Sequence, residues 1–358
     1  MIQQQNGEEQ LDAFVHGAKR HATVCIDTYS SELRDSEGFI GDRASNRAFR
    51  SILEDLRVRM RRVGGDPLGN QSTEDFSKKD LDKLLVKGDV EAAGLVHGAV
   101  EEFAQELAAV TNRYLKLKSW HKTKSIVVGG GFRASRIGEL AIGRAAVLLK
   151  TEHGHNIELR PIRHDPDEAG LVGNVHLISA KMFDGYDSML GVDIGGSNIR
   201  TGIVELNIRK DGDFRDAHVC SSDIWRHIDE KVSRDEAVER LAAMVRKLIR
   251  EADKKDLKLA PFIGVGCPGL IRDDGSIEKG GHNLPGNWES TRFNLPGSIQ
   301  KLIPEIGEKP TSVMMHNDAV VQGLSETPWM ADVEHWAVLT IGTGLGNARF
   351  TNCLYTKP

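Results

Sequence analysis

The segment MLGVDIGGSNIRTGIVE, at residues 189–205, constrains the fold of this chain more than any other. An apolar run enters a glycine pair and leaves it as a second apolar run, which is typical of two antiparallel strands joined by a tight turn. The same pattern returns at 336–352, WAVLTIGTGLGNARFTN. A third strand-like segment, DAHVC at 216–220, follows the first pair, and a helix is expected at about 233–252. The second pair has no third strand after it.

The N-terminal half contains a candidate for the third strand that the second strand pair lacks. HATVCIDTY, at 21–29, is rich in β-branched residues, and a segment of helical spacing follows at 45–60. We therefore predict that this strand completes the second meander and that the chain order is circularly permuted, with the cut in a surface hairpin. The other elements expected before residue 189 are a helix at 96–117, a strand at 124–132, a helix to about 149, a strand at 157–162 and a helix at 166–182.

Composition excludes several classes of protein. A length of 358 residues suits two packed units, and 39% apolar residues are enough for their cores. A net charge of -5 gives no cationic field for nucleic acid, and no apolar run is long enough to cross a bilayer. We expect no secretory leader, and we expect residues 1–10 to be frayed. The four cysteines are far apart and form no CxxC pair, which predicts reduced thiols in a cytoplasmic protein and no structural zinc: Cys25, Cys220, Cys267 and Cys353.

Both strand pairs turn through glycines, where no Cβ prevents a phosphate oxygen from reaching the backbone N–H groups. Asp193, just before the first turn, suits a water-mediated contact to Mg²⁺. The candidate phosphate-binding residues are Gly195, Gly196, Ser197 and Asn198 in the first turn and Gly342, Thr343, Gly344 and Gly346 in the second. A hairpin without a ligand is the alternative for either turn alone, but two such turns with acid or hydroxyl partners favour phosphate binding.

A third glycine cluster, VVGGGFRASR at 127–136, lies between a strand and a helix. It fits G-x-G-x-x-A, and Glu152 follows at about the distance of a ribose-binding acid, so a dinucleotide-binding unit of an NAD-linked oxidoreductase is one alternative. The long helix upstream and the lack of a second half of a doubly wound sheet argue against it. A wall for an adenosine fits the cluster equally well, formed by Gly129, Gly130 and Gly131.

The segment SVMMHNDAVVQGLSE, at 312–326, is an apolar strand that ends in polar residues before a helix. Asp318 is either a helix N-cap or a general base that accepts the proton of an attacking hydroxyl, with Asn317 holding a neighbouring hydroxyl. The loop at 266–290 adds amides and an aromatic ring, which suit a sugar; a solvated loop is the alternative. Its candidate residues are Gly269, His282, Asn283 and Trp288.

These motifs, in their order, resemble the ROK-type sugar kinases of the hexokinase/actin ATPase superfamily. The matching segments of the second half are GVDIGGSNIRTGIVE, GVGCPGLIRDDGSI, HNLPGNW, HNDAVVQGLSE and VLTIGTGLG. Those of the first half resemble the family's C-terminal half, which supports the permutation: KGDVEAAGLVHGAVEEFAQELAAVTNRYL, SIVVGGGF and DEAGLVGNVHLI. The resemblance covers most of residues 38–352. It implies a two-lobed α/β fold of the actin/hexokinase type, which is a duplicated ribonuclease H-like fold.

The resemblance also implies an ATP-dependent hexose kinase that uses Mg²⁺. A larger nucleotide-binding lobe would comprise residues 1–165 and 334–358, and a smaller lobe 166–333 would carry the first phosphate motif, the sugar loop and Asp318 as catalytic base. Asn317 and Asn283 match sugar-binding positions. We expect a small-molecule sugar as partner, no nucleic acid and no membrane, and leave open whether the chain forms a homodimer.

Two motifs of the family are missing: a Glu-x-Gly-His sugar motif and a cysteine-rich zinc motif. Glu32, Glu37 or Asp42 is a candidate replacement for the sugar contact. The missing motif keeps a second alternative open, a catalytically silent sugar-binding protein of the same fold. The first 20 residues hold no helix-turn-helix, which disfavours a DNA-binding repressor.

Overall fold

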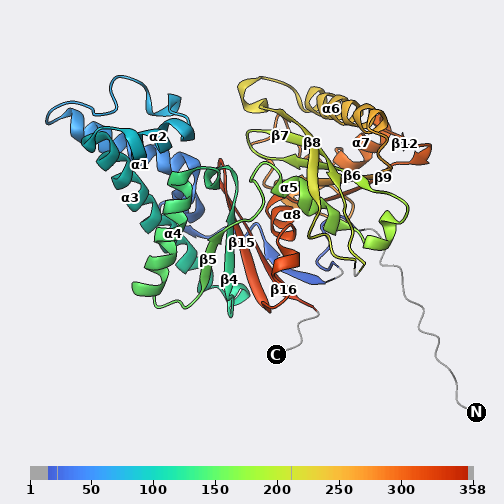
Figure 1. The fold of residues 1–358 in the computed structure, drawn as a ribbon, viewed down its shortest axis with the longest axis horizontal. Helices are drawn as coiled ribbons and strands as arrows, with labels where there is room; N and C mark the ends of the chain where they lie inside the picture. The colour runs from blue at the N-terminus through green and yellow to red at the C-terminus, as the bar shows by residue number, and fades with distance from the viewer. Residues whose placement is uncertain (1–14, 22, 211, 354–358) are drawn as a thin grey trace, which may run out of the picture.

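Two five-stranded mixed sheets form the framework of the molecule (Figure 1). The computed structural model describes residues 15–21, 23–210 and 212–353, and the segment 1–10 lies outside these ranges. The first sheet has the order β8-β7-β6-β9-β14, with β6 antiparallel to β7 and parallel to β9. Its strands are β6 Ser188–Ile194, β7 Ile199–Glu205, β8 His218–Trp225, β9 Leu259–Cys267 and β14 Ser312–Asn317.

The second sheet repeats this arrangement position by position. Its order is β1-β16-β15-β4-β5, with β15 antiparallel to β16 and parallel to β4. Its strands are β1 Val24–Tyr29, β4 Ser125–Gly129, β5 Glu158–Pro161, β15 His335–Ile341 and β16 Leu345–Asn352. The N-terminal β1 pairs antiparallel with β16 and fills the place that β8 takes in the first sheet. The expected third strand of the second meander is therefore confirmed, whereas a permuted order relative to other proteins stays a prediction.

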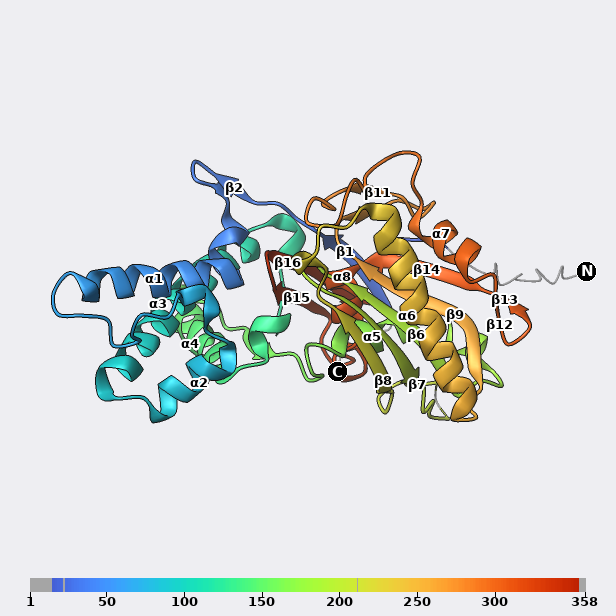
Figure 2. The same cartoon turned by 90° about the horizontal axis from the view of Figure 1, so that it is seen from above.

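Helices cover the outer faces of both sheets and fill the space between them (Figures 1 and 2). The second sheet is covered by α3 Val90–Leu115 and α4 Arg136–Thr151, on which α1 Asn46–Arg61 and α2 Lys78–Lys87 pack. The first sheet is covered by α6 Arg234–Lys254 and α7 Leu295–Leu302. Between the sheets lie α5 Ala169–Val172 and α8 Asp318–Leu324. Within the described ranges, no helix has the length and apolarity that crossing a membrane requires.

The alternation of side chains along the central strands explains these layers. In β4, Ile126 and Val128 join the outer core with α3 and α4, while Val127 joins the core between the sheets. In β6, Leu190 faces α6, whereas Met189 faces the shared core. Strands that are apolar on both faces need cover on both sides, which produces a layered molecule.

Three short ribbons complete the strands. They are β2 Arg34–Asp35 with β3 Gly38–Phe39, β10 Leu270–Ile271 with β11 Ile277–Lys279, and β12 Glu305–Ile306 with β13 Lys309–Pro310. The sequence analysis did not anticipate them, nor did it anticipate α2 or α7.

The continuous helix predicted for 166–182 is wrong. The chain forms the single turn α5 and then the short 3₁₀ segments Gly173–Leu177 and Ala180–Phe183. Glycine has a low helix propensity, and Gly173 lies so close to α8 that a Cβ there would be 1.8 Å from the Val321 carbonyl oxygen. Close packing against α8 thus favours short glycine-containing turns over a regular helix.

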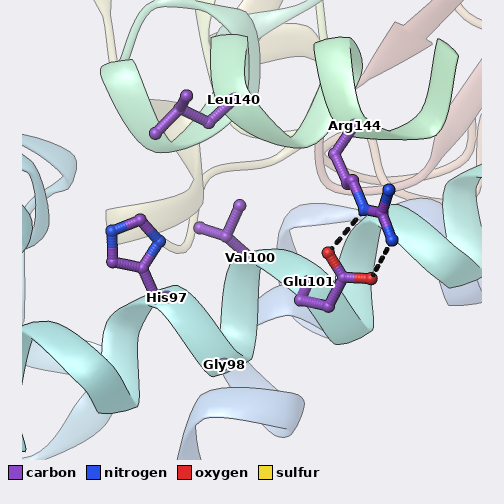
Figure 3. Close-up of a pocket in the computed structure, with 6 residues that line it drawn as sticks. All are labelled: His97, Gly98, Val100, Glu101, Leu140 and Arg144. Carbon is purple, nitrogen blue, oxygen red and sulfur yellow. Dashed lines mark hydrogen bonds and ion pairs between the residues drawn. The ribbon is translucent and has the colours of Figure 1, made fainter. Parts of the chain in front are cut away.

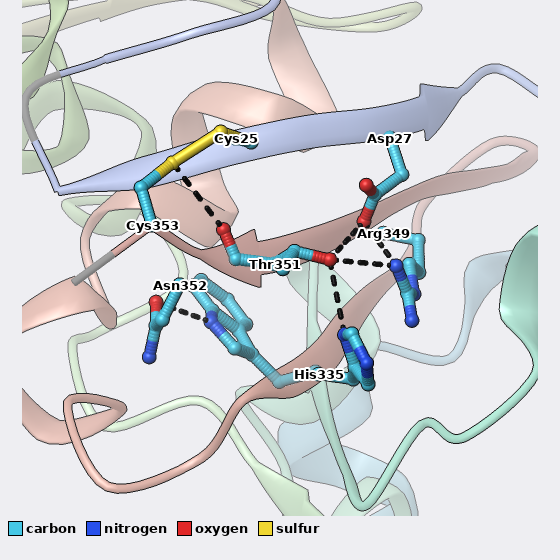
Figure 4. Close-up of a disulfide and its surroundings, with 8 residues drawn as sticks. Cys25, Asp27, His335, Arg349, Thr351, Asn352 and Cys353 are labelled. Atoms are coloured by element: carbon cyan, nitrogen blue, oxygen red, sulfur yellow. Dashed lines mark hydrogen bonds and ion pairs between the residues drawn. A yellow bond between two sulfur atoms is a disulfide. The ribbon is translucent and has the colours of Figure 1, made fainter. Parts of the chain in front are cut away.

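The prediction that all four cysteines are reduced thiols is also wrong. Cys25 in β1 and Cys353, just after β16, form a disulfide with a Cα–Cα distance of 6.1 Å (Figure 4). The pairing of β1 with β16 brings together two residues that are 328 positions apart. Spacing along the chain gave no sign of this proximity. Cys220 and Cys267 are free, and the cysteine argument for a cytoplasmic protein no longer applies to this pair.

Gly173→Ala tests the packing of the layer between the sheets. We expect it to lower the free energy of unfolding by about 2 kcal/mol or more, because the added methyl group overlaps the α8 backbone. Urea unfolding followed by far-UV circular dichroism measures the change.

Gly143→Ala in α4 is the matched control. Nothing lies within 4 Å of a Cβ at this exposed helical position, so the substitution should stabilise the chain by about 0.5–1 kcal/mol through helix propensity. Equal stability of the two variants would contradict the packing described here.

Candidate functional site

The predicted polar residues of the first sheet meet at one edge because β6, β9 and β14 are parallel. Asp193 near the end of β6 is paired with Gly266 in β9, and Asn317 at the end of β14 is paired with Cys267. A Cβ built on Gly266 would lie 3.5 Å from the Cα of Asp318 and 3.6 Å from Asp193 Oδ1. Both acids therefore flank the same glycine at the carboxyl ends of the strands.

The two predicted phosphate turns, although they belong to different sheets, touch each other. Ser197 Oγ in the β6–β7 turn and Thr343 Oγ1 in the β15–β16 turn are 2.8 Å apart. Across the part of the chain that the structure describes, five backbone N–H groups of these turns make no hydrogen bond: those of Gly196, Ser197, Asn198, Thr343 and Gly344. Successive free N–H groups at a turn form a typical anion-binding concavity.

Packing does not explain why several of these positions are glycine. A Cβ on Gly344 would meet nothing within 4 Å, and Cβ atoms on Gly342 and Gly195 would make only ordinary contacts, at 3.8 Å and 3.5 Å. None of the three has a positive φ. Gly346 is different, because its Cβ would lie 2.3 Å from Thr340 Oγ1. The three open glycines leave the backbone uncovered, which fits a ligand that binds to it.

Neighbouring segments hold the two turns in place. His227 Nε2 lies 2.9 Å from the Gly195 carbonyl oxygen, and the Ile228 N–H donates to the Ser197 carbonyl. On the other side, Arg47 Nε donates to the Thr343 carbonyl at 3.2 Å. The sequence analysis identified neither His227 nor Arg47, because no local motif marks residues that support a turn distant in the sequence.

Asp193 is buried, and its carboxylate forms an ion pair with the guanidinium of Arg200. Arg200 Nη1 donates to Asp193 Oδ2 at 3.4 Å, and Nη2 of the same arginine donates to Asp167 Oδ1 at 2.6 Å. Burial raises the pKa of Asp193, and Arg200 opposes the rise. Over the described residues, no group of three acidic, histidine or cysteine side chains could hold a metal directly. A hydrated Mg²⁺ contacted through water from Asp193 stays a prediction, and one carboxylate together with waters and substrate phosphates would suffice for it.

Asp318 is the first residue of α8 and is partly exposed. Loss of solvent raises the pKa of its carboxyl to about 7, and the charge of Asp193 contributes to the rise. A carboxylate with this pKa can accept a proton at neutral pH and release it again. The N-cap of α8 is Asn317 and not Asp318, so capping does not account for Asp318.

The side chain of Asn317 is engaged with the protein. Its Oδ1 accepts from the N–H groups of Ala319 and Val320, and its Nδ2 donates to Ser30 Oγ and to the Gly269 carbonyl, both at 3.1 Å. Gly269, with a φ of +102°, thus positions Asn317 through its backbone. In this arrangement Asn317 links β1, β14 and α8.

The sugar-loop residues lie beside the first turn. The Cβ of Asn283 is 3.3 Å from a Cβ built on Gly196, and Asn283 Nδ2 is 3.3 Å from His282 Nε2. Both side chains are exposed. Trp288 is buried and donates to the Pro285 carbonyl at 2.7 Å, so its role in the loop is structural.

The three acids considered for the sugar contact differ in their partners. Glu32 forms an ion pair with Arg34 at 3.1 Å, and Glu37 forms one with Arg43 at 2.8 Å. Asp42 is exposed and, of the three, is the acid without an ion pair in the described structure.

The third glycine cluster lies beside the second turn. Gly129 in β4 is paired with Thr340 in β15, and the Gly130 N–H donates to Gln322 Oε1 of α8 at 3.2 Å. The Gly131 carbonyl accepts from Lys78 Nζ. Lys78 is a further residue that the sequence analysis missed, because it belongs to the unanticipated α2.

The structure does not support the dinucleotide-binding alternative. Glu152, its proposed ribose-binding acid, is the C-cap of α4 and does not follow a strand. The helix begins near the carboxyl end of β4 and runs away from it, so Glu152 lies at the opposite end of α4 from the glycine cluster. Neither sheet has the purely parallel core of a doubly wound fold.

A surface hollow lies elsewhere, between α3 and α4 (Figure 3). An ion pair crosses it, in which Arg144 Nε donates to Glu101 Oε2 at 2.7 Å. It contains none of the predicted site residues; those that line it are His97, Gly98, Val100, Glu101, Leu140 and Arg144.

Asp318→Asn tests the raised pKa without any measurement of activity. The unfolded carboxyl has an ordinary pKa near 4, so the native state holds the proton more tightly and wild-type stability falls as pH rises from about 4 to about 7. The variant lacks this titration. The free energy of unfolding of the variant, relative to that of the wild type, should therefore increase from about pH 4 to about pH 7 and stay constant above about pH 7. Urea unfolding at pH 4.5, 6 and 8 measures the difference, and a constant difference would contradict the raised pKa.

Comparison with known proteins supports the sugar kinase resemblance. Residues 189–356 match the family model described as the ROK family. The curated Glucokinase of Thermotoga maritima is 30% identical over 168 residues, which are 46% of this chain and 44% of that protein. The chain therefore spans less than half the length of this curated relative.

Solved structures that are named as ROK proteins align over a similar share of the chain. A ROK family glucokinase from Streptomyces griseus, in complex with glucose and AMPPNP, has 19% identity and a TM-score of 0.34 over 46% of this chain and 45% of that chain. A ROK hexokinase from Thermus thermophilus has 22% identity and a TM-score of 0.30 over 45% of each. With TM-scores this low, the assignment rests on the sequence match.

The two matching sheets and the family match together confirm the expected two-lobed actin/hexokinase-like α/β fold class. Residues 189–356 of this chain match the ROK family model, and residues 1–188 lie outside that match.

Proposed function

We propose that the chain is a sugar kinase that transfers the γ-phosphoryl group of ATP to a hexose or hexose derivative, most simply to its primary hydroxyl. The observation that carries the proposal is the contact of the two turns at Ser197 and Thr343, which together have five backbone N–H groups without a hydrogen bond among the described residues. Asp318, the candidate base, is the first residue of α8, and this helix begins where β14 of the first sheet ends. The names of the relatives, a glucokinase and a hexokinase, support the substrate class.

In this proposal the two turns hold the nucleotide phosphates. The N–H groups of Gly196 and Ser197 would donate to phosphate oxygens from one turn, and those of Thr343 and Gly344 from the other. The strand end at Gly129–Gly131 flanks the adenosine, since it lies beside the second turn. A larger lobe around the second sheet and a smaller one around the first would then close on the nucleotide.

Asp318 is proposed to take the proton of the attacking hydroxyl. Its raised pKa, about 7, suits a group that must be ionised before transfer and protonated after it. Asn317 positions this carboxyl by capping α8, and Asn283 is placed beside the first turn, where it can contact the sugar. Mg²⁺, when bound through water to Asp193, would neutralise phosphate charge. Arg200 must then share Asp193 with the hydrated ion.

Asp318→Asn should lower kcat by about a thousandfold, because it removes the base, while the affinity for sugar stays within about twofold. A coupled ADP-release assay measures turnover, and calorimetric titration measures sugar binding. The wild-type kcat should also rise with pH through an apparent pKa near 7. Asp332→Asn, at an exposed position, is the control. A variant of Asp318 that keeps most of its turnover would remove the residue from this role.

A panel of hexoses, amino sugars and N-acetylated sugars in the same assay tests the function as a whole. Sugar-dependent ADP release with at least one member supports the kinase. Sugar binding without any ADP release would instead support the catalytically silent sugar-binding protein. That alternative is favoured by one observation, the engagement of Asp193 with Arg200.

A further inference from the structure

Lys78 reaches the predicted nucleotide site from outside both sheets. It is the first residue of α2, a helix that packs on α3 and α4. Its Nζ donates to the carbonyl of Gly131, just beyond the end of β4. Of the three N–H bonds of a lysine ammonium, this contact uses one.

The charge of Lys78 is poorly compensated. The side chain is half-buried, and loss of solvent lowers the pKa of its ammonium. Within the described residues no carboxylate forms an ion pair with it, although Asp167 and Asp82 act on it from a distance. Arg50 and Arg200 are close enough to repel it.

The two acids near Lys78 are already committed to other groups. Asp167 Oδ1 accepts from Arg200 Nη2 at 2.6 Å. Both carboxylate oxygens of Asp82 accept backbone N–H groups at the start of α4, each at 2.9 Å. A partly desolvated cation in these surroundings would gain from an additional anion.

The position of the ammonium indicates which anion would be suitable. The ammonium is bonded to Gly131, in the strand end that flanks the proposed adenosine. Arg200, which holds Asp193, is near enough for its charge to act on the ammonium. We propose that Lys78 binds the phosphate groups of the nucleotide and so bridges the α2 helix to the site between the turns. This inference rests on the proposed kinase function and adds to it a phosphate contact from outside the two glycine turns.

Lys78→Met tests the inference through binding alone. Titration calorimetry with ADP and with adenosine, at low salt and with Mg²⁺, separates a phosphate contact from a contact to the nucleoside. A hydrogen bond between charged groups is worth enough to change affinity about tenfold. We expect the variant to bind ADP about tenfold more weakly and adenosine unchanged, and Lys78→Arg to recover most of the ADP affinity.

Lys79→Met is the matched control, since Lys79 is the next residue of the same helix and is exposed. It should bind ADP like the wild type. Wild-type affinity for ADP in the Lys78→Met variant would overturn the inference, and so would an equal loss for ADP and adenosine, which would indicate a structural role. If the wild type turns over ATP and sugar but the variant shows no change, this inference alone fails. If the wild type binds neither ADP nor adenosine, the kinase proposal fails as well.

Discussion

The packing of α8 between the two sheets is the constraint on which the rest of the molecule depends. This short helix contacts β9 and β14 of one sheet and β15 and β16 of the other, and its residues belong to the core that both sheets share. Because α8 starts where β14 ends, its position fixes where Asp318 lies. The same packing brings the turn of one sheet against the turn of the other, at Ser197 and Thr343. The apolar packing of α8 between the sheets therefore determines where Asp318 and the two glycine turns lie.

Much of the fold could be predicted from local patterns. The strand–glycine–strand repeats gave β6 and β7 and, later in the chain, β15 and β16, because alternation and turn residues are local properties. The place of β1 beside β16 followed from the repetition of the pattern, although its partner is more than 300 residues away. The continuous helix at 166–182 failed because close packing of Gly173 against α8 is a tertiary effect that no local pattern reports.

Residues of the candidate site could be predicted where they stand in a short motif whose chemistry is recognisable. The glycine turns, Asp193 and Asp318 all stand in short motifs, and the structure brings them to one region. Lys78, Arg47 and His227 reach the same region from other elements without any sequence signal. The disulfide between Cys25 and Cys353 was not predicted for the same reason, because only the pairing of β1 with β16 brings the two cysteines together. The circularly permuted chain order stays a prediction, because two sheets of the same order also occur in a duplicated fold that is not permuted.

The central claim is that the two glycine turns face each other over a single nucleotide. Hydrogen exchange of the backbone amides tests it directly. The N–H groups of Gly196, Ser197, Asn198, Thr343 and Gly344 make no hydrogen bond to any residue that the structure describes, so they should exchange rapidly in the free protein. Titration with Mg·ADP should slow exchange in both turns together and should saturate at one nucleotide per chain. Protection of one turn alone, or of neither at saturating nucleotide, would contradict the account.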